Sequence, residues 1–178
     1  MEIIVQPITG LEVVRRACEM TMHGQKSKVT LAQMYRAEHS PIRARMFWIE
    51  LRGIPTFVSV HLVRHKHGVE HFVQSMRDDL YIDPTTVVDR NTPVNHGMLI
   101  NAQALITISR KRLCLKAHAK TVGVWSRLRR AIAEHDADLA RAMAPECVYR
   151  NGLCPELREC KPGVAKVCGA YAKRNAAQ

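Results

Sequence analysis

Alternating apolar and polar positions predict two β-strands in the first third of the chain. Residues 1–7, MEIIVQP, form an apolar run that Pro7 closes, because proline cannot continue the hydrogen bonding of a strand. In residues 47–51, FWIEL, apolar and polar side chains alternate before the chain reaches Gly53. A period of two indicates a strand with one buried face.

Apolar residues spaced three or four positions apart predict helices. Leu11, Val14 and Cys18 mark one helix over residues 10–22, and residues 29–38 predict a shorter one after a polar loop. Pro55 suits the first turn of a third helix.

Two longer helices are predicted in the second half of the chain. Residues 98–114 form a mostly apolar run with few breakers, and residues 124–143 carry an amphipathic stripe that Pro145 stops. The segment before them, residues 78–96, is rich in turn formers, and the tail after Pro145 has the composition of a loop.

Length and composition favour one folded domain. The chain has 178 residues, of which 47% are hydrophobic, enough to form a core. We expect a single domain over residues 1–145 and a cysteine-containing extension over residues 146–178. No apolar run is long enough to span a bilayer, and the first residues lack the pattern of a signal peptide, so a cytoplasmic protein is expected.

The charge balance favours anionic partners. Lys and Arg number 27 against 16 for Asp and Glu, which gives a net charge of +11. Nucleotides, nucleic acid and acidic surfaces all suit such an excess, and a solvated basic surface is the alternative.

Cysteines gather in the tail, at positions 147, 154, 160 and 168. Disulfides are not expected in a reducing cytosol. The spacing lacks the CxxC pair of most structural zinc sites, so ordinary thiols are the preferred interpretation and a zinc site is the alternative. The sequence alone therefore assigns no metal ligand.

Residues 61–77 concentrate histidines and cations around a short turn. Arg64, His65 and Lys66 come first, and Ser75 and Arg77 follow. Arginine forms paired hydrogen bonds with phosphate oxygens and serine adds a hydroxyl, so the two groups could close on a phosphate. The alternative is a polar helix end whose cations bind backbone carbonyls.

The histidines at positions 61, 65, 67 and 71 form two i,i+4 pairs around Gly68. Such pairs can bind a metal on one helix face, but the HExxH order is missing and the glycine separates the pairs. Partly buried or ligand-facing histidines are the preferred interpretation. The chain also lacks GxGxxG, P-loop and GxSxG motifs, so the corresponding classes are not indicated.

A series of ordered segments resembles the flavin-dependent thymidylate synthases. That family carries the signature RHRxxSxNxxSxR after a strand of the type FxFEIxG and a helix that ends in LVRH. Here the matching segments are FWIELRG at 47–53, HLVRHK at 61–66, QSMR at 74–77, INAQALITISRKR at 100–112 and VGVWSRLRR at 122–130. The resemblance covers residues 40–143 and implies an α+β fold, with an antiparallel or mixed sheet packed against long helices.

Several positions depart from the family pattern, and most of them correspond to flavin contacts. Lys66 replaces an arginine, His71 stands where the signature has asparagine, and one extra residue precedes Ser75. Gln103 replaces the arginine of the second segment, whereas the asparagine of that segment is retained as Asn101.

The resemblance implies a role for each matching residue. The substrate-binding residues would be Gln74, Ser75, Arg77, Arg90 and Arg112. The cofactor-binding residues would be Arg64, His65, Lys66, His71 and Asn101. Arg112 and His65 would be catalytic, with Arg112 facing the base and His65 lining the cofactor side.

The resemblance also implies an activity. The family transfers a one-carbon unit from methylenetetrahydrofolate to carbon 5 of the deoxynucleotide dUMP, with hydride from reduced FAD and with NADPH as reductant. We therefore expect a homotetrameric methyltransferase. Because the flavin positions differ, folate-dependent hydroxymethylation of dUMP or dCMP, with weak or no use of flavin, is an alternative. The net charge supports another hypothesis, a non-catalytic nucleotide- or nucleic-acid-binding protein.

Overall fold

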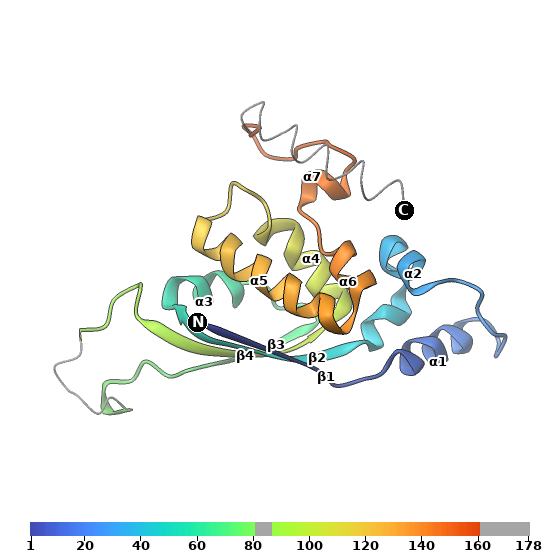
Figure 1. Ribbon diagram of the computed structural model, residues 1–178, viewed down its shortest axis with the longest axis horizontal. Coiled ribbons are helices and arrows are strands. Elements are labelled where there is room, and N and C mark those ends of the chain that lie inside the picture. The colour runs from blue at the N-terminus through green and yellow to red at the C-terminus, as the bar shows by residue number, and fades with distance from the viewer. Residues whose placement is uncertain (81–86, 161–178) are drawn as a thin grey trace.

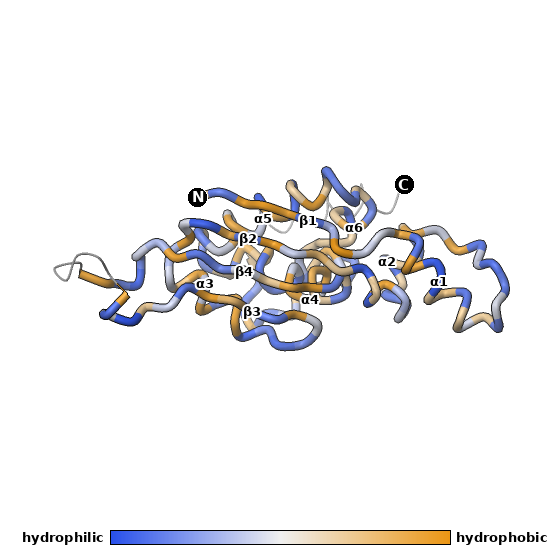
Figure 2. The backbone as a smooth tube through the Cα atoms, turned by 90° about the horizontal axis from the view of Figure 1, so that it is seen from below, coloured by the Kyte–Doolittle hydropathy of each residue, from blue (hydrophilic) through white to orange (hydrophobic). Residues whose placement is uncertain are grey.

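An antiparallel sheet with helices on one face organises the computed structural model, which describes residues 1–80 and 87–160 (Figure 1). The strands are β1 (Glu2–Pro7), β2 (Met46–Pro55), β3 (Val69–Val73) and β4 (Pro93–Asn101). They lie in the order β1-β2-β4-β3, as Figure 2 shows. The expected α+β class and the predicted first two strands are confirmed.

Helices α3 to α6 cover one face of the sheet in Figure 1. The helix bounds are α1 Leu11–Thr21, α2 Leu31–Ala37, α3 Thr56–Leu62, α4 Ala102–Arg112, α5 Ala119–His135, α6 Ala137–Ala142 and α7 Glu146–Tyr149, with short 3-10 helices at Ser40–Ala44 and Asp78–Leu80. The predicted helices over residues 10–22 and 29–38, and the one starting near Pro55, are confirmed. No helix in the described part of the chain is long and apolar enough to cross a membrane.

The core lies between the sheet and these helices. Phe47, Ile49 and Leu51 of β2 are fully buried on this side, and Trp125 and Leu128 of α5 are fully buried as well. The alternation in β2 therefore has its expected cause, because successive side chains point to opposite faces of a strand.

The prediction of one helix over residues 98–114 is wrong for its first four residues. They complete β4, in which Val94, His96, Met98 and Ile100 are buried while the residues between them are less so. Pairing with both β2 and β3 makes this segment a central strand, and such long-range pairing overrides a local helical pattern. Residues 93–96 are accordingly strand and not turn.

The predicted helix over residues 124–143 is in fact two helices, and Asp136 marks the break. Its backbone is extended (φ −156°), and its side chain accepts a hydrogen bond from Leu139 N at 3.0 Å, which caps α6. The buried carboxylate also accepts a hydrogen bond from Tyr35 Oη at 2.7 Å and lies 3.6 Å from Arg45 Nε. Burial raises the pKa of Tyr35, so the phenol stays a donor. This buried group joins α2, α6 and the entry to β2.

The described part of the tail, residues 146–160, contains little regular secondary structure. A single helical turn, α7, follows Pro145 where a loop was expected. Figure 1 shows α7 beyond α4, on the side away from the sheet. The predicted boundary between the domain, residues 1–145, and the cysteine-containing extension, residues 146–178, stays a prediction. Cys168 lies outside the described residues.

Candidate active site

The turn between α3 and β3 places the first half of the signature beside the start of α4. Gly68 has φ +73°, and a Cβ at this position would lie 2.7 Å from the Asn101 side-chain nitrogen, so the turn requires glycine. Asn101 N donates to Gly68 O at 3.0 Å, and the Asn101 side chain accepts from Ala104 N at 2.8 Å. Asn101 thus caps α4 and holds the loop that carries Arg64, His65 and Lys66.

Arg112 and His65 lie in direct contact. Arg112 Nε donates to His65 Nε2 at 2.9 Å, and Arg112 Nη2 donates to His61 O at 2.5 Å. Because an arginine can only donate, His65 Nε2 must carry a lone pair, and the imidazole is neutral with its proton on Nδ1. Burial, Arg112 and His71 lower the pKa of His65 to about 4, in agreement with the neutral form of the ring.

A histidine chain continues inward from this pair; we use the name for Ser59, His96, His71 and His65. Ser59 Oγ lies 2.9 Å from His96 Nδ1, His96 Nε2 lies 2.9 Å from His71 Nδ1, and His71 Nε2 lies 2.8 Å from His65 O. The carbonyl can only accept, so His71 Nε2 carries a proton. In the contact between His96 and His71 one ring nitrogen donates and the other accepts, and His96 Nδ1 makes the complementary bond with the hydroxyl of Ser59.

His96 is the buried member of the histidine chain, with 1% of its surface exposed. Burial, and then the charge of His71, lower the pKa of His96 to about 4. The ring is therefore neutral at pH 7. Its two ring nitrogens connect α3 to β3 through β4, so the histidine chain fixes the position of the His65 carbonyl.

Positive charge accumulates on the outer side of His65. We call Arg64, Arg90 and Arg112 the basic cluster. Burial lowers the pKa of His61, and the charges of Arg112, Arg64, His118 and Arg90 lower it further, which places all four near that imidazole. The pKa of Arg112 is likewise lowered by burial and by Arg64.

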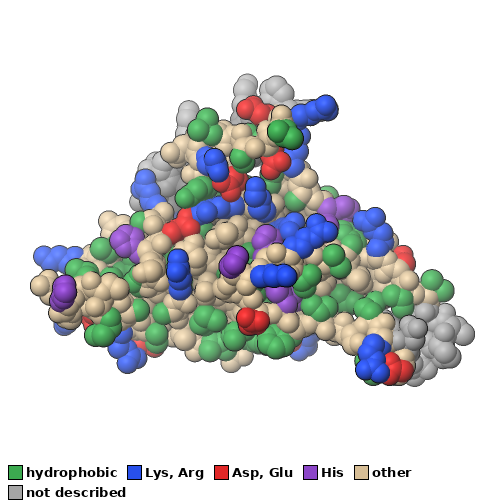
Figure 3. Space-filling model, turned by 180° about the vertical axis from the view of Figure 1, so that it is seen from behind, with side chains coloured by type: hydrophobic (Ala, Val, Ile, Leu, Met, Phe, Trp, Pro, Cys, Tyr) green, Lys and Arg blue, Asp and Glu red, His purple; other side chains and the backbone are tan. Residues whose placement is uncertain are grey.

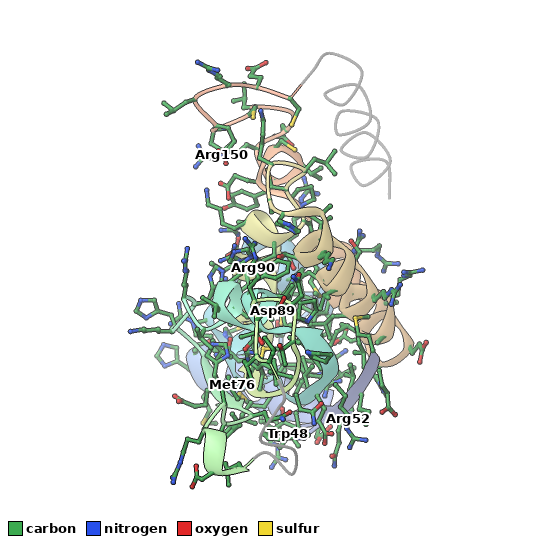
Figure 4. All side chains as sticks on the ribbon, turned by 90° about the vertical axis from the view of Figure 1, so that its left-hand side faces the viewer. Trp48, Arg52, Met76, Asp89, Arg90 and Arg150 are labelled. Carbon is green, nitrogen blue, oxygen red and sulfur yellow. The ribbon has the colours of Figure 1, made fainter. Side chains whose placement is uncertain are left out.

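The ring of Phe57, in α3, contacts both Arg90 of the basic cluster and His118. The Arg90 guanidinium lies 4.9 Å from the centre of the Phe57 ring, and the His118 ring lies 4.6 Å from it. Figure 4 shows Arg90 on the helix side of the sheet, and Figure 3 shows Lys, Arg and His side chains gathered near the middle of one face. Within residues 1–80 and 87–160, no carboxylate forms an ion pair with the basic cluster.

The second half of the signature lies elsewhere. Gln74 extends the pairing of β3 with β4 through two hydrogen bonds to the backbone of Asn95, at 2.9 and 3.0 Å. The Arg77 side chain is 72% exposed and donates to both oxygens of Asp79, at 2.9 and 2.6 Å. Ser75 Oγ accepts from Arg77 N at 3.3 Å.

The structure therefore brings together five of the residues that the sequence proposed, namely Arg64, His65, His71, Arg90 and Arg112. It leaves Gln74, Ser75 and Arg77 at the exit of β3, without a hydrogen bond to the basic cluster in the described part of the chain. Lys66 is exposed on the loop, and Asn101 acts as a helix cap. Whether these residues bind substrate or cofactor stays a prediction.

Sequence reasoning missed Ser59, His96 and His118. His96 was assigned to a turn-rich segment. Val94, His96 and Met98 are buried at every second position, which is the pattern of a strand. Gly68 separates the i,i+4 histidine pairs as expected, because it lies between α3 and β3. Among the residues that the structure describes, no three His, Cys, Asp or Glu side chains are arranged to hold a metal ion.

Comparison with solved structures identifies the fold as a divergent form of the flavin-dependent thymidylate synthase fold. Thymidylate synthase X from Helicobacter pylori, solved with FAD and dUMP, superposes with a TM-score of 0.62 at 14% identity, over 80% of this chain and 99% of that one. PolB from Streptomyces cacaoi, a UMP/dUMP methylase bound with 5-Br dUMP, gives 0.57 at 15% identity, over 79% and 94%.

No family model matches the chain, and no curated protein matches it by sequence. The structural matches confirm the resemblance that the sequence motifs implied, at the level of the fold.

Proposed function

We propose that this protein transfers a one-carbon unit from methylenetetrahydrofolate to carbon 5 of a pyrimidine deoxynucleotide monophosphate, with dUMP as the first candidate. The observation that supports it best is the basic cluster, in which three arginines lack a carboxylate partner among the described residues. A phosphate or a uracil oxygen would offset their mutual repulsion. Two proteins with this fold were solved with dUMP or 5-Br dUMP.

Each arginine has a distinct role in this proposal. Arg112 would face the base, since its position is fixed by His65 and by the His61 carbonyl. There a cation stabilises negative charge that develops on the ring oxygens when carbon 5 attacks the one-carbon unit. Arg90, Ser75 and Arg77 would bind the phosphate.

Arg77 can change partner at little cost. Its ion pair with Asp79 is exposed, and pairs of that kind contribute about 1 kcal/mol or less. A phosphate dianion offers the same guanidinium a stronger, two-point acceptor.

The residues at the loop before β3 fit the acceptor groups of FAD. Arg64 and Lys66 are exposed cations suited to a diphosphate, and His65 retains one N–H, on Nδ1, because Arg112 occupies its other nitrogen. Reduced FAD, if bound there, would supply hydride to the one-carbon unit, and NADPH would be the corresponding reductant. The part played by this chain is to present these donors.

Hydroxymethylation of dUMP or dCMP is the second candidate, and one observation favours it. His71 stands at the asparagine position of the signature, and both of its ring nitrogens are engaged by His96 and by the His65 carbonyl. It has no hydrogen bond left to offer a flavin. With weaker flavin binding, water in place of hydride would complete the transfer.

We also propose a homotetramer, in which a second copy of the chain brings Ser75 and Arg77 to the basic cluster. The face of the sheet opposite the helices supports this, because it carries Trp48 and Phe72 with ring centres 5.4 Å apart. Ile4 and Leu99 lie on the same face, which no helix of the described residues covers (Figures 1 and 2). Light scattering of the purified protein tests the assembly.

The test of the activity is release of tritium from dUMP labelled at carbon 5, in the presence of methylenetetrahydrofolate. The expected result is release by the wild-type protein, and mass spectrometry of the product separates methyl from hydroxymethyl transfer. Repeating the assay with and without FAD and NADPH measures the need for flavin. No release from labelled dUMP or dCMP under any of these conditions, together with retention of nucleic acid that falls steeply with salt, would favour the non-catalytic binding protein.

A further inference from the structure

Phe57, near the start of α3, has polar side chains from two other segments of the chain packed around its ring. Phe57 itself is buried, with 8% of its surface exposed. The Arg90 guanidinium lies 4.9 Å from the centre of this ring, the His118 ring 4.6 Å and Lys120 Nζ 6.0 Å. Guanidinium and ammonium groups at such distances are attracted to the face of an aromatic ring. We call Phe57, Arg90, His118 and Lys120 the Phe57 cluster.

Hydrogen bonds fix this cluster from two sides. Phe57 N donates to Arg90 O at 3.0 Å, so the start of α3 holds the segment that leads into β4. One turn further along α3, His61 Nδ1 lies 2.9 Å from Thr121 Oγ1, and Thr121 belongs to the first turn of α5. The Phe57 cluster therefore has a defined geometry, although its three polar members are exposed.

His118 presents one hydrogen-bond donor to the exterior. It is the N-cap of α5, and its Nδ1 accepts from Lys120 N at 3.2 Å. Because Nδ1 accepts, the proton of the neutral ring is on Nε2. Between the residues that the structure describes, Nε2 of this ring forms no hydrogen bond. The Nε2–H group is therefore free to bind a ligand.

The two cations of the Phe57 cluster lack an acidic partner. Within residues 1–80 and 87–160, neither Arg90 nor Lys120 forms an ion pair. Asp89 is the adjacent acidic residue, and its carboxylate accepts from Asn91 N at 2.8 Å and from Thr92 Oγ1 at 3.3 Å. The N-terminus of α5, a helix of 17 residues, adds the positive end of the helix dipole. These groups suit an anion with several acceptor oxygens.

The Phe57 cluster lies about one helical turn from the residue proposed to face the base. Arg112 Nη2 donates to His61 O at 2.5 Å, and the centre of the His61 ring lies 5.6 Å from that of Phe57. Phe57 and His61 are four residues apart, or about 6 Å along the axis of α3. In a mononucleotide the sugar separates the base from the phosphate by a comparable span, so one nucleotide reaches both places.

We propose that Arg90, His118 and Lys120 bind the 5′-phosphate of the pyrimidine nucleotide, which makes His118 and Lys120 further substrate-binding residues. This inference rests on the proposed function and extends its phosphate site to α5. A phosphate monoester carries a charge of about −1.5 to −2 at pH 7 and has three acceptor oxygens. They match one guanidinium, one ammonium and one imidazole N–H, whereas a carboxylate offers two oxygens and a single charge.

Calorimetric titration of the full-length protein with dUMP and with deoxyuridine tests the proposal, and Lys120→Ala is the first variant. We expect its affinity for dUMP to fall about tenfold, because one charge-assisted contact to phosphate is lost. Its affinity for deoxyuridine, which has no phosphate, should equal that of wild type. Lys26→Ala is the matched control, since it removes an exposed lysine between α1 and α2, a segment at the opposite end of the molecule from α3 (Figure 1).

The second variant, His118→Asp, separates phosphate binding from helix capping. Aspartate is a good N-cap, so the thermal stability of the protein should be kept, whereas its negative charge repels a phosphate. We expect the affinity for dUMP to fall at least about tenfold, with no change for deoxyuridine. A lower Tm together with unchanged dUMP affinity would show that His118 acts only in the fold, and would overturn its assignment.

The results distinguish this inference from the proposed function. Unchanged dUMP affinity in Lys120→Ala, beside weakened affinity in Arg112→Ala, would overturn the inference and leave the proposed function standing. If Lys120→Ala lost affinity only for methylenetetrahydrofolate or only for single-stranded DNA, the Phe57 cluster would bind that anion instead, and the inference would be wrong. Wild-type protein that binds neither dUMP nor dCMP would contradict both.

Discussion

The basic cluster and the histidine chain include the first half of the sequence signature, the exit of β3 with Ser75 and Arg77 holds the second half, and the two regions are built differently. In the first, His65, His71 and His96 receive their hydrogen bonds from the protein itself. In the second, Arg77 is 72% exposed and bonds to its near neighbour Asp79. The fold therefore fixes the first half, whereas the second half can exchange its partner for a ligand.

This difference shows what each departure from the family pattern does. His71 and Lys66 replace residues of the half that contacts flavin in the resembling family. In this chain His71 has become a structural link between His96 and the loop. The residues expected to bind the nucleotide keep their chemical types. Substrate class is accordingly the stronger inference, and flavin use is the weaker one.

The largest expected effect is that of Arg112→Ala on nucleotide binding. Removing this side chain deletes one charge from the basic cluster and leaves His65 Nε2 without its donor. We expect the affinity for dUMP to fall about 100-fold, or about 3 kcal/mol. Calorimetric titration measures it, with Arg130→Ala, an exposed cation of α5, as the matched control. Equal affinity of wild type and Arg112→Ala would show that the basic cluster does not bind the nucleotide.

Acidification is expected to weaken the fold through the histidine chain. His96 has a pKa of about 4 in the folded protein, against an ordinary value of about 6.5, so the unfolded chain binds the extra proton more readily. The stability that neutral His96 contributes is full above pH 6.5 and is lost as the pH falls toward 4. The loss amounts to about 3 kcal/mol.

Denaturant unfolding at a series of pH values measures this loss. His96→Gln is the control, because glutamine can bond to Ser59 and His71 without titrating in this range. The slope of unfolding free energy against pH between 4 and 6.5 should be smaller in the variant. An unchanged slope would mean that His96 is not the titrating group.

Deleting the same side chain tests the structural role of the histidine chain directly. His96→Ala leaves Ser59 and His71 with unpaired groups and opens a cavity in the core. The expected loss of unfolding free energy is about 2–3 kcal/mol, whereas Ser75→Ala at the exit of β3 should change it by about 0.5 kcal/mol or less. Similar losses in both variants would remove the distinction between the two halves.

The smallest expected effect is that of Arg77→Ala. Because its ion pair with Asp79 is exposed, we expect unfolding free energy to stay within about 0.5 kcal/mol of wild type. The affinity for dUMP should fall about tenfold, since one charge-assisted contact to phosphate is lost. Thermal unfolding and dUMP titration of the same sample measure both quantities. A large loss of stability with unchanged affinity would reverse the assignment.

Local pattern predicted much of the fold, and pairing between distant segments decided the rest. Period-two alternation located β2, and helical spacing located α1 and α2. Residues 98–101 were misassigned because a buried helix and a central strand can both have a continuous run of apolar residues, so the pattern does not distinguish them.

The site residues that lie in sequence motifs could be predicted, whereas those defined only by contacts in the folded chain could not. Arg64, His65, His71, Arg90 and Arg112 were found through ordered segments that resemble a known family. Ser59 and His96 lie 37 positions apart in the sequence, and no local pattern connects them.

Calorimetric titration of the wild-type protein can compare dUMP with deoxyuridine, the same molecule without its phosphate. If arginines on this fold bind a pyrimidine nucleotide monophosphate, dUMP binds saturably and the affinity for deoxyuridine is at least about 100-fold lower, because charge-assisted bonds to phosphate are lost. Equal affinity for both, or binding of neither dUMP nor dCMP, would contradict it.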